Sequence, residues 1–104
     1  MNKVTAVDMH HKTFESIRQT DADGNEYWLS RQLGRVLEYS EYRHFQPVLE
    51  RAKEACQNSG HPIADHFEDF LEMVDIGSGA KRPMEDGVKL SRYACYLIVQ
   101  NADP

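Results

Sequence analysis

The stretch IGSGAKRPMEDGVKLSRYACYLIVQN, residues 76–101, holds the most concentrated apolar run of the chain. Its second half has the spacing of a buried helix, because apolar residues recur at i, i+3, i+4, i+7 and i+8: Leu90, Tyr93, Ala94, Leu97 and Ile98. The hydroxyl of Ser91 can accept a hydrogen bond from a free amide of the first turn. We therefore expect a helix that begins near Arg92 and follows a short strand at residues 88–90.

The first half of the same stretch is basic and rich in glycine. Gly77 and Gly79 lead into Lys81, Arg82 and Pro83, a pattern that excludes a helix and predicts a loop with two adjacent cations. Residues 74–76 and 84–90 can pair as a hairpin with this loop at or near its tip.

Length and composition describe an ordinary globular domain. The chain has 104 residues, of which 40% are hydrophobic and 28% charged, and its net charge is −5. This charge excludes a polycation that binds nucleic acid through overall charge, so any such contact must be local. We find no run of apolar residues long enough for a membrane span and no secretory signal, and we expect a cytoplasmic protein without a membrane partner.

The remaining pattern predicts an α+β fold, a small single domain in which two short β-hairpins pack on three or four helices. Residues 1–12 are expected to be a disordered leader, and residues 13–104 the domain, an N-terminal fragment of a longer protein. Strands at residues 13–18 and 27–29 would form the first hairpin around the turn at residues 21–25. A helix capped by Ser30 would run through Leu37 with Arg31 and Arg35 pointing outward.

A longer helix is expected from Ser40 to the stop signal at Gly60, with Pro47 kinking or restarting it. Residues 63–74 give a mixed pattern, for which we favour a helical turn followed by a strand. This region is acidic without any lysine or arginine among its charges: Asp65, Glu68, Asp69, Glu72 and Asp75.

The sequence contains no complete motif for a metal site or a catalytic site. Asp21, Asp23 and Asn25 have the start of a calcium loop, but Glu26 stands where its sixth-position glycine should be. His61 and His66 are five residues apart and do not share a helix face. We expect no enzyme, no catalytic residue, no cofactor and no metal.

Both cysteines lie among apolar residues. Cys56 and Cys95 are therefore expected to be reduced core residues rather than nucleophiles.

The basic segment remains the strongest candidate site. Backbone amides of a glycine-containing loop can hold an anion, and the two adjacent cations can contact phosphate oxygens. The pattern GxxxxGK[ST] of a P-loop is absent. From the residues alone, a solvated hairpin loop and a contact with a phosphate backbone have about equal weight.

Four segments carry a family resemblance: ERAKEACQNSG (50–60), DHF (65–67), MVDIGSGAKR (73–82) and LSRYACYLIVQNADP (90–104). They closely resemble the N-terminal part of the bacterial DNA-damage-inducible protein D family, and the chain is similar, more loosely, to the Bro-N domain of phage antirepressors and baculovirus proteins. Trp28 and LGRVLEYS (33–40) also resemble that family's tryptophan and LLGYS segment, with Glu38 where the family often has glycine. Pro47 stands in a helix that in the family is usually free of proline.

The resemblance implies a bacterial protein of the SOS response to DNA damage and a domain that binds DNA. Our hypothesis assigns the phosphate contacts to the basic segment, with three arginines outside the loop helping: Lys81, Arg82, Gly77 and Gly79, together with Arg92, Arg31 and Arg35. The alternative is a protein-interaction or dimerisation module, a homodimer or a partner of recombination or repair proteins, that uses the acidic residues 65–75.

Overall fold

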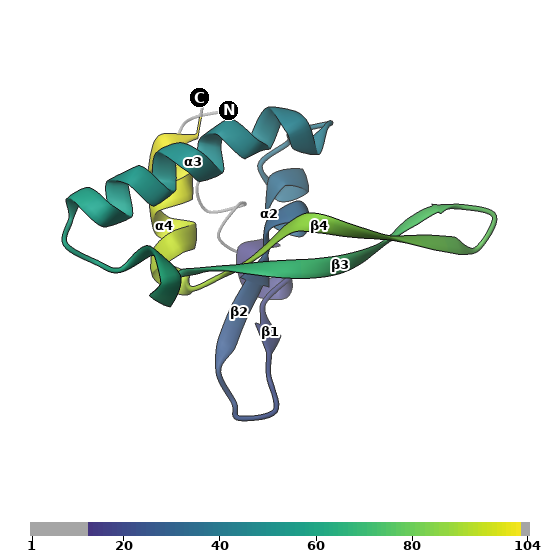
Figure 1. Ribbon diagram of the computed structural model, residues 1–104, viewed down its shortest axis with the longest axis horizontal. Coiled ribbons are helices and arrows are strands. Elements are labelled where there is room, and N and C mark those ends of the chain that lie inside the picture. The colour runs from purple at the N-terminus through teal and green to yellow at the C-terminus, as the bar shows by residue number, and fades with distance from the viewer. Residues whose placement is uncertain (1–12, 103–104) are drawn as a thin grey trace.

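The computed structural model describes residues 13–102 and has α+β architecture, which confirms the predicted class (Figure 1). The leader predicted at residues 1–12 lies outside the described residues. In chain order the elements are β1 (Gln19–Thr20), β2 (Glu26–Leu29), α2 (Ser30–Val36), α3 (Tyr42–Asn58), the 3₁₀ turn η1 (Ile63–Asp65), β3 (Phe67–Gly77), β4 (Ala80–Leu90) and α4 (Arg92–Asn101). The structure has no described helix that is both long and apolar enough to cross a bilayer.

The two hairpins join into one antiparallel sheet with the order β1-β2-β4-β3. The junction is the pairing of Trp28 with Leu90, two residues that are both buried. The prediction of two short hairpins is wrong for the second one, whose strands have 11 residues each.

The first predicted strand is also wrong. Residues 13–16 are helical, and only Gln19 and Thr20 pair with β2. Phe14 instead stacks on Trp28, with ring centroids 4.4 Å apart, and accepts a hydrogen bond from the indole N–H on its carbonyl. The predicted turn is present, and the Oδ1 atom of Asp21 accepts hydrogen bonds from the backbone amides of Asp23 and Asn25.

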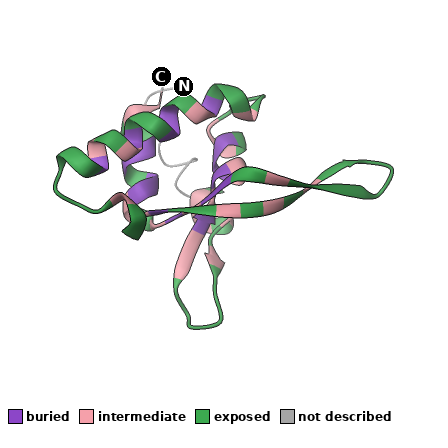
Figure 2. Ribbon diagram, in the orientation of Figure 1, coloured by how far each residue is buried: buried purple, intermediate pink, exposed green. Residues whose placement is uncertain are grey.

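The hydrophobic core lies between the sheet and the crossed helices α3 and α4 (Figures 1 and 2). Its fully buried side chains include Trp28, Phe45, Leu33, Leu90 and Ile98. α3 is one continuous helix of 17 residues that includes Pro47, so the helix does not restart at the proline. A proline this close to the helix start removes one hydrogen bond, to the carbonyl of the exposed Arg43, which water can satisfy.

One of the two predicted helix caps is present and the other is not. Ser91 caps α4 as expected, and its hydroxyl accepts a hydrogen bond from the amide of Ala94 at 3.0 Å. Ser30 does not cap α2, because its hydroxyl lies in the core and accepts a hydrogen bond from the amide of Val88.

The ends of α2 and α3 share one geometry. In both cases the residue that follows the C-cap has positive φ: Glu38 (70°) after α2 and Gly60 (82°) after α3. The amide of Tyr39 donates to the carbonyl of Gly34, and the amide of His61 donates to that of Cys56, as in a Schellman motif.

Residues 63–74 fold as expected, into a helical turn followed by a strand. The helical turn is limited to residues 63–65, and the strand begins at Phe67. Apolar residues at positions 63, 67, 70, 71 and 74 coincide with helical spacing, but most of this strand lies beyond the core. The usual alternation of buried and exposed residues is therefore not imposed on it.

Residues 71–86 of the β3–β4 hairpin, called the arm below, project from the rest of the domain, called the body (Figures 1 and 2). None of the residues of the arm is buried. One extra residue of β4 interrupts the ladder at the base of the arm, between the pairs Phe70–Gly87 and Glu72–Met84. A Cβ on Gly87 would lie 2.9 Å from the carbonyl oxygen of Phe70, so this position requires glycine.

Candidate nucleic-acid interface

The end of the arm is a narrow turn formed by Gly77, Ser78 and Gly79, called the tip below. All three residues have positive φ. The amide of Gly77 donates a hydrogen bond to the carboxylate of Asp75 at 2.9 Å. A Cβ on either glycine would meet no atom within 4 Å, so the glycines serve the backbone turn and leave the tip slim.

Lys81 and Arg82 lie next to the tip, but in β4 rather than in the loop predicted for them. Both are exposed, and neither forms an ion pair with any residue that the structure describes. Lys81 pairs in register with Asp75, and Arg82 pairs with Val74. Because neighbouring residues of a strand point to opposite faces, the two cations lie on opposite faces of the arm.

Arg31 has a different environment from the exposed one predicted for it. Its side chain is only 10% exposed and forms ion pairs with Glu72 (2.8 Å) and Asp86 (2.5 Å) of the arm. The guanidinium also lies 4.3 Å from the ring centroid of Tyr42. Desolvation lowers the pKa of Arg31, and hydrogen bonds to the two carboxylates outweigh it, so the pKa is raised overall.

Tyr42 completes the attachment of the arm to the body. Its hydroxyl donates to the carbonyl of Asp86 at 2.7 Å and is 2.7 Å from the hydroxyl of Ser30. Gln46 reaches the Asp86 carboxylate from the next turn of α3. Helices α2 and α3 thus hold the base of the arm through polar contacts, to which Arg31, Tyr42 and Gln46 contribute.

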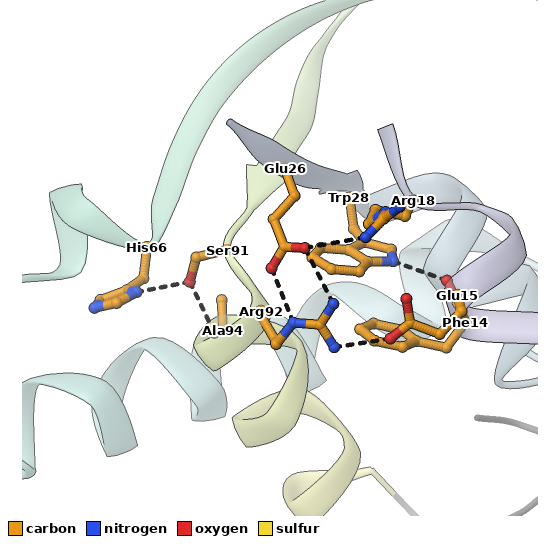
Figure 3. Close-up of polar contacts among 9 residues, drawn as sticks. All are labelled: Phe14, Glu15, Arg18, Glu26, Trp28, His66, Ser91, Arg92 and Ala94. Carbon is orange, nitrogen blue, oxygen red and sulfur yellow. Dashed lines mark hydrogen bonds and ion pairs between the residues drawn. The ribbon is translucent and has the colours of Figure 1, made fainter. Parts of the chain in front are cut away.

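Arg92 is likewise engaged within the protein (Figure 3). Its guanidinium donates two hydrogen bonds to Glu26 and one to Glu15. It lies 5.1 Å from the ring centroid of Trp28 and 5.8 Å from that of Phe14. The hydrogen bonds to Glu26 and Glu15 raise the pKa of Arg92, and those from Arg92 lower the pKa of Glu26.

Arg35 is exposed and has no ion pair in the described part of the chain. One turn of α2 separates it from Arg31, so the two share a helix face. Both line a shallow cavity of about 130 Å³ together with Gly34, Tyr39, Ser40 and Tyr42. The cavity places a free guanidinium near polar side chains on the side of α2 that holds the arm.

The acidic residues are spread over two elements rather than one helix face. Asp65 belongs to η1, whereas Glu68, Asp69, Glu72 and Asp75 lie along β3. Glu72 is engaged by Arg31, and the others form no ion pair among the described residues.

The histidines and cysteines of the described residues lie apart from the arm. The described residues contain no group of three or more histidine, cysteine or acidic side chains that could hold a metal ion. His66 instead contacts the hydroxyl of Ser91 (Figure 3). Cys56 and Cys95 are free and buried, as predicted, and burial raises the pKa of both thiols.

Sequence reasoning grouped five cations that the structure separates. Lys81, Arg82 and Arg35 are free to meet a ligand, while Arg31 and Arg92 are occupied by carboxylates up to 77 residues away in sequence. No local signal reveals such distant partners. The polar attachment of the arm through Ser30 and Tyr42 was missed for the same reason.

The structure defines a small α+β domain with free cations at the end of a projecting hairpin. The chain matches the BRO family, N-terminal domain (Bro-N), over residues 16–104 and belongs to this family. It is 65% identical to DNA damage-inducible protein D of Escherichia coli (strain K12) over 95 residues, which are 91% of this chain and 34% of that protein. The chain therefore spans about a third of the length of this curated relative. No solved structure matches it.

Proposed function

We propose that this domain binds double-stranded DNA by inserting the end of the arm into a groove. The observation that carries the proposal is the placement of Lys81 and Arg82 on opposite faces of an exposed two-stranded ribbon. Both cations can contact phosphates at once if the ribbon lies in a groove, between the two sugar–phosphate backbones of the duplex. The major groove of B-DNA is wide enough to admit a two-stranded β-ribbon and offers that arrangement.

The shape of the arm supports entry into a groove. The tip has no bulky side chain, because two of its three residues are glycine and the third is Ser78. The body fixes the direction of the arm through Arg31, Tyr42 and Gln46. A rigidly held ribbon loses less entropy on binding than a flexible loop.

The charge distribution limits the contact to two places. The carboxylates of Glu68, Asp69 and Glu72 lie nearer the body than Lys81 and would repel a phosphate backbone there, so the arm would meet DNA at its end. Arg35 in its cavity on α2 supplies a second anchor for a phosphate on the same side as the base of the arm. Arg31 and Arg92 are assigned to holding the fold, since their charges are already paired.

The biological setting comes from the relative, whose name is DNA damage-inducible protein D. We propose that the longer protein to which this domain corresponds acts in the response to DNA damage, with this domain as a binding module and without a catalytic step of its own.

The direct test is a gel shift on duplex and single-stranded DNA with Lys81→Ala combined with Arg82→Ala. Loss of two phosphate contacts should weaken duplex binding roughly tenfold or more at low salt. The matched control is Arg43→Ala with Lys53→Ala on α3, which removes the same charge from cations already paired with glutamates. A folded tip variant that binds duplex DNA like the parent would show that the arm is not the contact site.

A further inference from the structure

β3 is an edge strand with one free side. In the sheet order β1-β2-β4-β3 it pairs only with β4, and the described residues place no strand against its outer edge. Its 11 residues present a long row of unpaired backbone groups. Exposed edges of this length are templates for the addition of another strand, and proteins that leave them bare usually protect them with charge.

One face of this edge carries an ordered set of exposed side chains. Asp69, Leu71, Met73 and Asp75 occupy every second position and are all exposed, with Leu71 at 56% and Met73 at 54%. Two apolar side chains are therefore flanked on both sides by a carboxylate. Neither flanking aspartate has an ion pair among the described residues, and Asp75 uses one oxygen for the amide of Gly77.

We propose that the edge of β3 binds an extended peptide segment of a partner protein by strand addition. The peptide carries a lysine or arginine on each side of two apolar residues, with one residue between each of these positions. Main-chain hydrogen bonds along the edge would supply affinity, and the alternate side chains would supply specificity. This site adjoins the proposed DNA contact, because Asp75 pairs in register with Lys81, but the argument for it does not rest on DNA binding.

Charge decides between a basic peptide and a second copy of this chain. Antiparallel pairing of two β3 strands centred on Glu72 would bring Leu71 opposite Met73 but would set Asp69 opposite Asp75 at both ends. Like charges directly opposite each other destabilise such a pair, whereas opposite charges stabilise it. The aspartates thus disfavour self-pairing and favour a cationic strand.

The test uses three synthetic peptides and isothermal titration calorimetry. KTVTITK has the proposed pattern, ETVTITE reverses its end charges, and KPVPIPK keeps the charges but has three prolines, which have no amide hydrogen and disfavour pairing as a strand. The parent protein should bind KTVTITK about tenfold or more tighter than either of the other two.

Charge reversal in the protein provides the second arm of the test. Asp69→Lys with Asp75→Lys should exchange the preference, so that ETVTITE binds and KTVTITK does not. Asp69→Asn with Asp75→Asn, a milder change, should make the two peptides equal. Glu50→Lys with Glu54→Lys on α3 adds the same charge to other exposed positions and should leave the preference unchanged.

Three results would overturn the proposal. KPVPIPK binding as well as KTVTITK would show charge attraction without strand addition. An unchanged preference in folded variants at positions 69 and 75 would exclude this face. A dimer of the parent that dissociates on substitution of Leu71 and Met73, measured by sedimentation, would assign the edge to a second copy instead.

Discussion

Replacing Glu38 by glycine should stabilise the domain. Glu38 has φ of 70° at the position after α2 where the Schellman motif favours glycine, and the equivalent residue after α3 is Gly60 with φ of 82°. A side chain in the left-handed region costs roughly 1–2 kcal/mol, while glycine adds about 0.5–1 kcal/mol of unfolded-state entropy. Glu38→Gly should therefore raise the free energy of unfolding by about 0.5–1 kcal/mol.

The reverse change at Gly60 measures the same effect with the opposite sign. A Cβ at Gly60 would meet no atom within 4 Å, so Gly60→Ala changes backbone strain without a steric clash and should cost about 1 kcal/mol or slightly more. Urea unfolding can be followed by the fluorescence of Trp28, the single tryptophan, which is fully buried. Glu38→Ala keeps the unfavourable φ and serves as the control for loss of the carboxylate.

The reasoning fails if Glu38→Gly lowers the stability, or if Glu38→Ala raises it as much as the glycine does. In the first case the Glu38 side chain would contribute contacts that outweigh its backbone strain. In the second, the gain would come from removing charge rather than from relaxing φ.

Two further predictions concern Arg31 and Arg92, which form ion pairs within the domain. Arg31→Met should destabilise the domain by about 2 kcal/mol, because it leaves Glu72 and Asp86 without their shared cation. The control Arg35→Met, one turn later on α2, should change the free energy of unfolding by less than about 0.5 kcal/mol, and equal losses for both variants in urea unfolding would contradict the prediction. Arg92 lowers the folded-state pKa of Glu26 below its ordinary value of 4.5, so the ion pair stabilises the fold above that pH and is lost as the pH falls through the lowered pKa. Arg92→Met should therefore be less stable than the parent at pH 7, with a difference that narrows below about pH 4; a constant gap across the pH series would contradict this.

Local sequence patterns predicted the parts of the fold that face the core. The helices at residues 30–36 and 92–101 and the length of α3 follow from apolar residues spaced three and four apart, which one shared core requires. The turns at residues 21–25 and 77–79 follow from residues that tolerate positive φ.

The sequence did not predict elements determined by distant partners. Residues 13–18 alternate like a strand, but the stacking of Phe14 on Trp28 favours the helical turn. The full length of β3 was not predicted, because the arm has no buried face to impose a period of two.

In the candidate site, too, local features could be predicted and tertiary contacts could not. The tip and its two cations could be identified from Gly77, Gly79, Lys81 and Arg82, whereas the pairing of Arg31 and Arg92 with carboxylates depends on tertiary contacts. The family resemblance drew attention to Glu38, and the structure gives the physical reason why glycine is favoured there.

The most direct test of DNA binding by the arm is the salt dependence of duplex affinity, measured by fluorescence anisotropy between about 50 and 300 mM NaCl. Each phosphate contact contributes about 0.9 to the slope of log K against log salt concentration for duplex DNA. Lys81→Ala with Arg82→Ala should therefore reduce the magnitude of the slope by about 1.8, and Arg43→Ala with Lys53→Ala should leave it unchanged. An unchanged slope in the folded tip variant would contradict the central claim that Lys81 and Arg82 contact the phosphate walls of a groove.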